Sequence, residues 1–249
     1  MKYLILALIA PYLAAQPVAP VEFDVVSIKP NKSGDNHSGT HDGHGTWRAT
    51  NTTVKSILIR AFGVLPEQIV GAPAWVDSDA FDIEAKAEYD SDDSEMMNRR
   101  LQAMLASRFQ LQIHRETRQL QTYALLVGKK GAKQMTPAVN KDGTSTNTNN
   151  GHMEAKGITM EGLAQRLAFW LGRVTVNETG LEGRFDLTLD FEPERSAKIT
   201  AANTPIAGVD SSKPTLMTAV QDQLGLKLES RKAPVEMLVV DRISRPSDN

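Results

Sequence analysis

Two stretches decide the fold: Thr53–Gly63 (TVKSILIRAFG) and Thr159–Gly172 (TMEGLAQRLAFWLG). In each, a threonine stands before apolar residues spaced three or four apart, and a glycine follows the last of them. This spacing puts the apolar side chains on one face of a helix. The threonine hydroxyl can cap the first turn, and glycine commonly ends the last one. The sequence therefore predicts the same amphipathic helix once in each half of the chain.

The segments after these helices also correspond. Phe81–Ile83 (FDI) and Phe185–Leu187 (FDL) each open a run in which apolar and polar residues alternate, as in a strand with one buried face. A second helix is predicted after Ser94 in the first half and after Thr215 in the second. Each of these helices is followed by further apolar strands. The two halves therefore carry one pattern of elements.

The predicted fold class is α+β, with two similar small lobes that arose by internal duplication. Each helix has one apolar stripe and each strand alternates, so a short sheet with two helices packed on it buries both. We expect the lobes at residues 21–128 and 158–246. The polar segment 129–157, which includes 144–151 (TSTNTNNG), is expected to be a linker or exposed loop. Whether the halves share one sheet is left open.

The first fifteen residues have the order of a secretory signal. Lys2 precedes an apolar run from Tyr3 to Leu13, and the small residues Ala14 and Ala15 follow it. The run is shorter than the roughly 20 residues that cross a bilayer. We therefore expect residues 1–15 to be removed, and a secreted or periplasmic product without a membrane span. A cleavage site a few residues later, near Ala19, and an uncleaved anchor are the alternatives.

The amino-acid composition excludes several kinds of functional site and partner. The chain has no cysteine, which excludes disulfides, thiol catalysis and thiolate metal sites. Its formal net charge is −2 at pH 7, so no basic excess favours nucleic acid as a partner. The sequence contains no G-x-S-x-G, H-E-x-x-H, Walker A or G-x-G-x-x-G motif. No cofactor is predicted.

Six motifs carry a family resemblance: FDVVSIKPN (23–31), IVGAPAWVDSDAFDI (69–83), MLASRFQLQIHR (104–115), TGLEGRFDLTL (179–189), LGLKL (224–228) and PVEMLVVDR (234–242). Together they make the chain similar to the soil-associated secreted protein family of unknown function. The resemblance implies export and assigns no catalytic residue. Some members carry the module joined to membrane sensor metallopeptidase domains, which favours sensing or binding. Each half also distantly resembles the short N-terminal domain of secretins and TonB-dependent receptors, which docks protein partners.

A cluster of histidines offers candidate metal ligands. His37, His41 and His44 stand in a glycine-rich stretch, and neutral imidazoles there could gather around Zn, Cu or Ni. No regular element fixes their spacing, so the alternative is a solvated loop.

Trp75 and two aspartates also stand out. Trp75 follows the turn formers Gly71 and Pro73, so its ring either packs against a core edge or serves as a partner-binding anchor. Asp82 and Asp186 occupy the same place in both halves. Repetition favours a structural role for them, such as accepting hydrogen bonds from backbone amides at a turn.

These observations lead to one principal hypothesis for function. The chain is expected to be a non-enzymatic binding or protein-interaction module with an envelope protein as partner. The alternatives are an envelope hydrolase with a site between the lobes and a metal-binding protein that uses the His37–His44 loop. A buried cleft between the lobes with converging charged groups would favour the enzyme, and filled lobes with an exposed apolar or edge-strand surface would favour the module.

Overall fold

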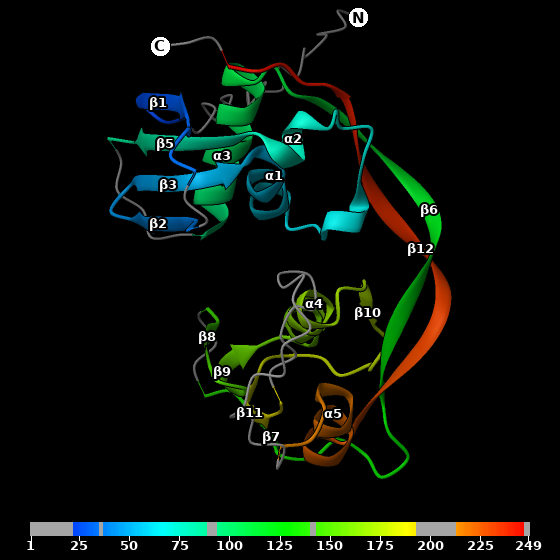
Figure 1. Cartoon of the computed structure of the whole chain (residues 1–249). Helices are drawn as coiled ribbons and strands as arrows, with labels where there is room; N and C mark the ends of the chain where they lie inside the picture. The colour runs from blue at the N-terminus through cyan, green and yellow to red at the C-terminus, as the bar shows by residue number, and fades with distance from the viewer. Residues whose placement is uncertain (1–21, 35–36, 89–93, 140–142, 193–212, 247–249) are drawn as a thin grey trace, which may run out of the picture. The chain divides into compact units, whose positions relative to one another are not determined.

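The computed structural model describes residues 22–34, 37–88, 94–139, 143–192 and 213–246 (Figure 1). The predicted signal, residues 1–15, lies outside them. The chain divides into two compact units. The first consists of residues up to Phe62 together with Trp75–Leu111 and the chain end from Ser244, and the second of Gly63–Ala74 and Gln112–Ile243.

The first unit is built on sheet A, a four-stranded antiparallel sheet. Its strands lie in the order β1 (Val25–Pro30), β5 (Ala80–Lys86), β3 (Thr46–Thr53) and β2 (Gly39–Gly43). Its helices are α1 (Val54–Phe62), the short α2 (Trp75–Ser78) and α3 (Ser94–Arg108). Side chains alternate between buried and exposed along β3 and β5, so only one face of the sheet is covered. The buried side chains include Ile28, Trp47, Phe81, Ile83, Ile57, Leu58, Leu101 and Leu105.

Sheet C of the second unit has the same plan. Its order is β7 (Met135–Pro137), β11 (Phe185–Asp190), β9 (His152–Ile158) and β8 (Ser145–Asn149), again antiparallel. The helices α4 (Met160–Leu171) and α5 (Leu216–Leu224) contribute to its core. That core includes Met153, Leu163, Leu167, Leu187, Leu189, Leu216 and Leu224.

Sheets A and C match strand for strand. When β1, β5, β3 and β2 are set against β7, β11, β9 and β8, the strand order is identical. The threonine caps also recur, because the hydroxyls of Thr53, Thr159 and Thr215 accept hydrogen bonds from the amides of Ser56, Gly162 and Thr218. The α+β class is confirmed, and the two matching sheets support the predicted duplication.

A third sheet, sheet B, joins strands from both halves of the sequence. It runs β10 (Thr175–Asn177), β6 (Gln112–Val127), β12 (Leu226–Arg242) and β4 (Ile69–Val70), with the 3-10 turn η1 (Pro66–Gln68) before β4 (Figure 1). The long strands β6 and β12 are antiparallel, while β10 runs parallel to β6 and β4 parallel to β12. Each short strand thus pairs with the long strand of the other half, so the halves share one sheet.

The predicted lobe boundaries need correction. Residues 129–157 are not a linker, because β7, β8 and most of β9 lie in that range. The first half also gives β4 and β6 to the second unit, so neither 21–128 nor 158–246 is a unit by itself. The error has a physical cause. The strand β8 (STNTN) is an exposed edge strand without a buried apolar face, so its sequence lacks the apolar–polar alternation from which strands are predicted.

Both β-hairpins turn through two residues with positive φ. These residues are His44 (51°) and Gly45 (69°) between β2 and β3, and Asn150 (45°) and Gly151 (73°) between β8 and β9. Positive φ at both central positions is typical of a type I′ turn, which favours Asn-Gly. We therefore expect Asn150→Ala to destabilise the chain by about 1 kcal/mol and Asn150→Gly to have a much smaller effect. Urea unfolding measures both; equal losses would contradict the turn assignment.

Candidate functional site

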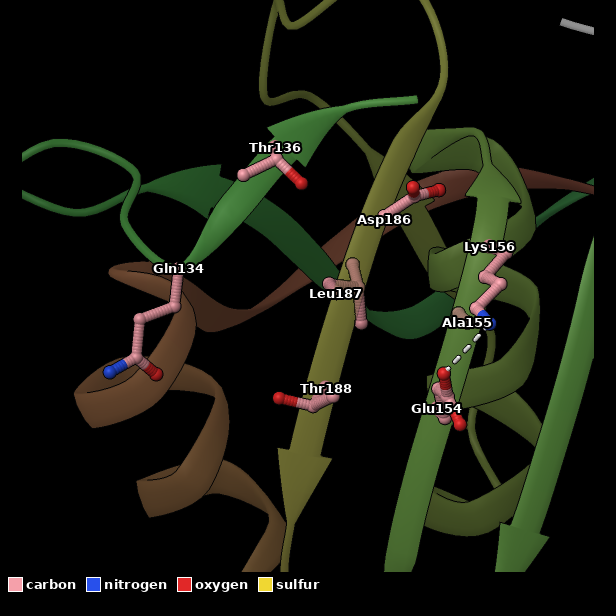
Figure 2. Close-up of a pocket in the computed structure, with 8 residues that line it drawn as sticks. All are labelled: Gln134, Thr136, Glu154, Ala155, Lys156, Asp186, Leu187 and Thr188. Carbon is pink, nitrogen blue, oxygen red and sulfur yellow. Dashed lines mark ion pairs between the residues drawn. The ribbon is translucent and has the colours of Figure 1, made fainter. Parts of the chain in front are cut away.

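A shallow depression lies on the exposed face of sheet A, and another lies on that of sheet C. The depression of sheet A measures about 270 Å³ and lies over β1, β5 and β3. That of sheet C measures about 240 Å³ and lies over β7, β11 and β9 (Figure 2). Both faces are polar because every second residue of these strands points away from the helices.

The two depressions occupy the same place in the duplicated fold. Two buried positions correspond, Ala49 with Ala155 and Ile83 with Leu187. The six other positions also match pair by pair: Ser27 with Gln134, Lys29 with Thr136, Arg48 with Glu154, Thr50 with Lys156, Asp82 with Asp186, and Glu84 with Thr188. Because all eight lining positions correspond, the depression is a property of the repeated unit.

An aspartate lines each depression and holds the neighbouring strand. Asp82 Oδ1 accepts hydrogen bonds from Asn31 Nδ2 at 2.8 Å and from the Asn51 amide at 2.9 Å. Asp186 Oδ1 accepts one from the Gly157 amide at 2.8 Å. Asn51 and Gly157 both have positive φ, 51° and 67°, and the strand register shifts beside both aspartates. The predicted structural role of the two aspartates is confirmed.

These hydrogen bonds make the Asp82 carboxylate sensitive to acid. The Asn31 side chain and then the Asn51 amide hold the pKa of Asp82 below its ordinary value. A carboxyl group with a lowered folded pKa stabilises the fold above its unfolded pKa of about 3.9, and this contribution is lost as pH falls through the folded value. We expect Asp82→Ala to cost about 1–3 kcal/mol at pH 7, since two donors lose their acceptor.

The measurement is unfolding free energy against pH for wild type and Asp82→Ala. The difference between the two should be constant above about pH 5 and shrink below about pH 4. Glu84→Ala is the matched control on the same strand, because Glu84 forms an ion pair with Arg48 in which both side chains are exposed, and its cost should stay under about 1 kcal/mol. A difference in unfolding free energy between wild type and Asp82→Ala that does not change with pH would contradict this account.

Charge differs between the depressions although their shape recurs. In sheet A, Arg48 and Glu84 form an ion pair at 2.8 Å across neighbouring strands. In sheet C, Glu154 and Lys156 pair along one strand at 3.2 Å, as Figure 2 shows. All four side chains are at least half exposed and hydrated. Such groups can donate and accept hydrogen bonds and form ion pairs with a polar partner, but the depressions do not enclose a ligand.

The three histidines that were predicted as metal ligands lie at different places along one hairpin. His37 precedes β2, and its carbonyl accepts a hydrogen bond from the Asn51 side chain. His41 lies in β2 opposite Arg48, and His44 is the first turn residue. Within the described ranges, no group of three or more His, Asp or Glu side chains could hold a metal ion. The three histidines do not form such a group in this structure, and metal binding by the His37–His44 loop stays a prediction.

Trp75 is the first residue of α2 and is half buried. The Arg245 guanidinium lies 5.0 Å from the centre of its ring, and the same guanidinium pairs with Asp79 at 2.8 Å. The chain's own arginine therefore already occupies one contact of the ring. A partner-binding role for Trp75 stays a prediction.

Two histidine–carboxylate pairs were missed by the sequence reasoning. His114 Nδ1 lies 2.8 Å from Asp241, and His152 Nδ1 lies 2.8 Å from Asp190. All four side chains are about half exposed. Over the part of the chain that the structure describes, neither ring is hydrogen-bonded to a serine or threonine hydroxyl, so a nucleophile–base–orienter arrangement is not assembled there. The partners are distant in sequence, which leaves no local signal for such pairs.

Comparison with known protein families shows which family the chain matches. A family model described as "Protein of unknown function (DUF3738)" matches residues 29–243. The chain belongs to the DUF3738 family. This agrees with the predicted membership of an uncharacterised family; soil association and the secretin-like resemblance of each half stay predictions. No curated protein and no solved structure matches this DUF3738 chain. Among its described helices, none has the length and apolar character needed to cross a membrane.

Proposed function

We propose that this DUF3738 protein is an exported, non-enzymatic binding module of the cell envelope, which uses the open faces of sheets A and C to hold a protein partner. The observation that carries the proposal is the correspondence of all eight lining positions in the two depressions. A duplicated, polar, open surface suits repeated contact with a macromolecule. Enclosed small-molecule pockets are typically larger, at roughly 300–1,000 Å³, and bury most of their ligand.

Export is supported by the order of the first fifteen residues, in which one cation precedes an apolar run and two alanines. The absence of cysteine also has a practical use. A single engineered cysteine can carry a crosslinker at any chosen surface position, because nothing else in the chain reacts with a thiol reagent.

The test places a benzophenone crosslinker in each depression. Ser27→Cys labels the sheet A depression and Thr188→Cys labels that of sheet C. The matched controls are Ala106→Cys on α3 and Gln165→Cys on α4, which are exposed helix positions on the two units. Each labelled chain is irradiated with an envelope fraction of the source organism, with and without an excess of unlabelled chain.

We expect one protein to be crosslinked from both depression positions, to be absent from both control positions, and to disappear when unlabelled chain competes. Equal capture from all four positions, or from the helix positions only, would contradict a binding role for the sheet faces. A parallel screen of the chain against cell metabolites should show no turnover. If a metabolite is chemically converted, the binding-module proposal is wrong and the envelope-enzyme alternative is favoured.

A further inference from the structure

Strands β2 and β8 are equivalent sheet edges that carry no lysine, proline or bulge. Each is five residues long, ends its sheet in the strand order, and pairs with its one neighbour without a register shift. Their sequences, GTHDG and STNTN, contain no lysine and no proline. The opposite edges are guarded, since β1 ends in Lys29 and Pro30, and β7 ends in Pro137. Exposed edges normally carry lysine, proline or a bulge because they otherwise attract another strand.

The hairpin geometry fixes which main-chain groups face outward. In a two-residue hairpin the residues that flank the turn form a hydrogen-bonded pair, and such pairs alternate with non-hydrogen-bonded ones along the ladder. Gly43 with Thr46 and Asn149 with His152 are the flanking pairs. It follows that Thr40 and Asp42 in β2, and Thr146 and Thr148 in β8, turn their N–H and C=O groups away from the sheet.

A helix arginine holds each edge strand in place. Arg60 of α1 donates to Asp42 of β2 at 2.8 Å. Arg166 of α4 donates to Thr146 of β8. Arg60 lies seven residues after the capping residue Thr53, and Arg166 lies seven residues after Thr159. The two arginines therefore occupy the same position in the two helices. A strand that is already extended loses less conformational entropy when a partner pairs with it.

We propose that the edges of β2 and β8 each accept an extended segment of a partner protein, which adds to sheet A or C as a fifth strand through main-chain hydrogen bonds. The inference rests on the binding role proposed above and names the kind of partner. Alternate side chains of the added strand would lie on the open face, beside the rows His41–Arg48–Glu84 and Asn147–Glu154–Thr188. These rows are polar and charged, so the fitting segment is polar at those positions.

A second copy of the chain fits the two edges less well than a separate segment. If copies of the chain paired edge to edge, each added copy would bring a further free edge unless the arrangement closed into a ring. A short extended segment of another protein ends the sheet instead.

The test removes one outward N–H group and leaves the ladder intact. Thr148→Pro deletes the donor that faces outward, at an edge position where proline is tolerated. Thr148→Val is the matched control, because it keeps the N–H and loses only the hydroxyl. The probe is a displayed library of random octapeptides selected on the wild-type full chain. Binding of the selected peptide is then measured on wild type, both variants and Thr40→Pro, which deletes an outward-facing N–H group of β2. Thermal unfolding shows that each variant is folded.

We expect Thr148→Pro or Thr40→Pro to weaken the selected peptide at least tenfold and Thr148→Val to change its affinity less than twofold. N-methylation of every second peptide amide should abolish binding when the methylated amides are those that face the edge strand. Methylation of the other set should leave binding intact. Unchanged affinity for both proline variants, or a library that yields no peptide sensitive to them, overturns the edge proposal. Self-association of the chain that Thr148→Pro abolishes overturns it in favour of a second copy. Crosslinking from the depressions that persists in the proline variants refutes the edge but keeps the binding module.

Discussion

Gly225→Ala is expected to destabilise the second unit by about 3 kcal/mol, from a left-handed backbone and a clash together. Gly225 ends α5 with φ 65°, and a Cβ there would lie 2.1 Å from the Gly131 carbonyl oxygen. The loop cannot easily yield, because the amides of Gly128 and Lys133 donate to the carbonyls of Gly225 and Leu224 at 2.8 and 2.9 Å. The measurement is the free energy of unfolding from urea titration.

The repeat supplies its own control for this prediction. Gln110 follows α3 as Gly225 follows α5, and it also has positive φ, 52°, although it carries an exposed side chain. Gln110→Ala keeps the Cβ that is already there, so we expect a clearly smaller loss of stability than at Gly225. Equal effects at the two positions would mean that the contact between the 128–133 loop and the end of α5 is absent in solution.

An engineered disulfide across sheet B is expected to have the largest effect of all. Gln119 of β6 lies directly opposite Pro234 of β12, and both are exposed. Proline has no N–H to give, so the pair must be a non-hydrogen-bonded one, with Cα atoms about 4.5 Å apart. That distance suits a disulfide. In the double variant Gln119→Cys, Pro234→Cys, the bond closes a loop of roughly 115 residues and should stabilise the fold by about 4–5 kcal/mol.

The reduced form of the same variant is the control, because it shares both substitutions and lacks only the bond. Air oxidation should be complete without denaturant, and unfolding of oxidised against reduced chain gives the increment. The neighbouring pairs Arg118–Val235 and Leu120–Ala233 flank Gln119–Pro234 in the same register. Failure of the two thiols to join in the native chain would show that β6 and β12 do not pair in this register.

Much of the fold could be predicted because its signals are local. A threonine cap, apolar spacing and a closing glycine identified α4 over Thr159–Gly172, and the structure ends it at Gly172 with φ 59°. Sheet B could not be predicted, because β4 and β10 have two and three residues and take their partners from the other half. Pairing between distant strands depends on tertiary packing that no short window contains.

The candidate site was only half visible in the sequence. Asp82 and Asp186 were found by their repetition, and their hydrogen bonds to backbone amides explain it. Extending the same alignment to the alternate residues on each side would have predicted which residues share the exposed face. The edge strands were hidden, because β2 and β8 are polar on both sides and therefore resemble loops.

Amide-resolved hydrogen exchange with and without bound partner tests most directly whether the repeated sheets are the binding surface. In the free chain, the amides of Thr40, Asp42, Thr146 and Thr148 should exchange rapidly, while the ladder amides of His41 and Asn147 are protected. Binding of the selected peptide or the captured partner should slow the outward amides of at least one edge by tenfold or more. Protection confined to the helices, with both edges and both open faces unchanged, would contradict the account.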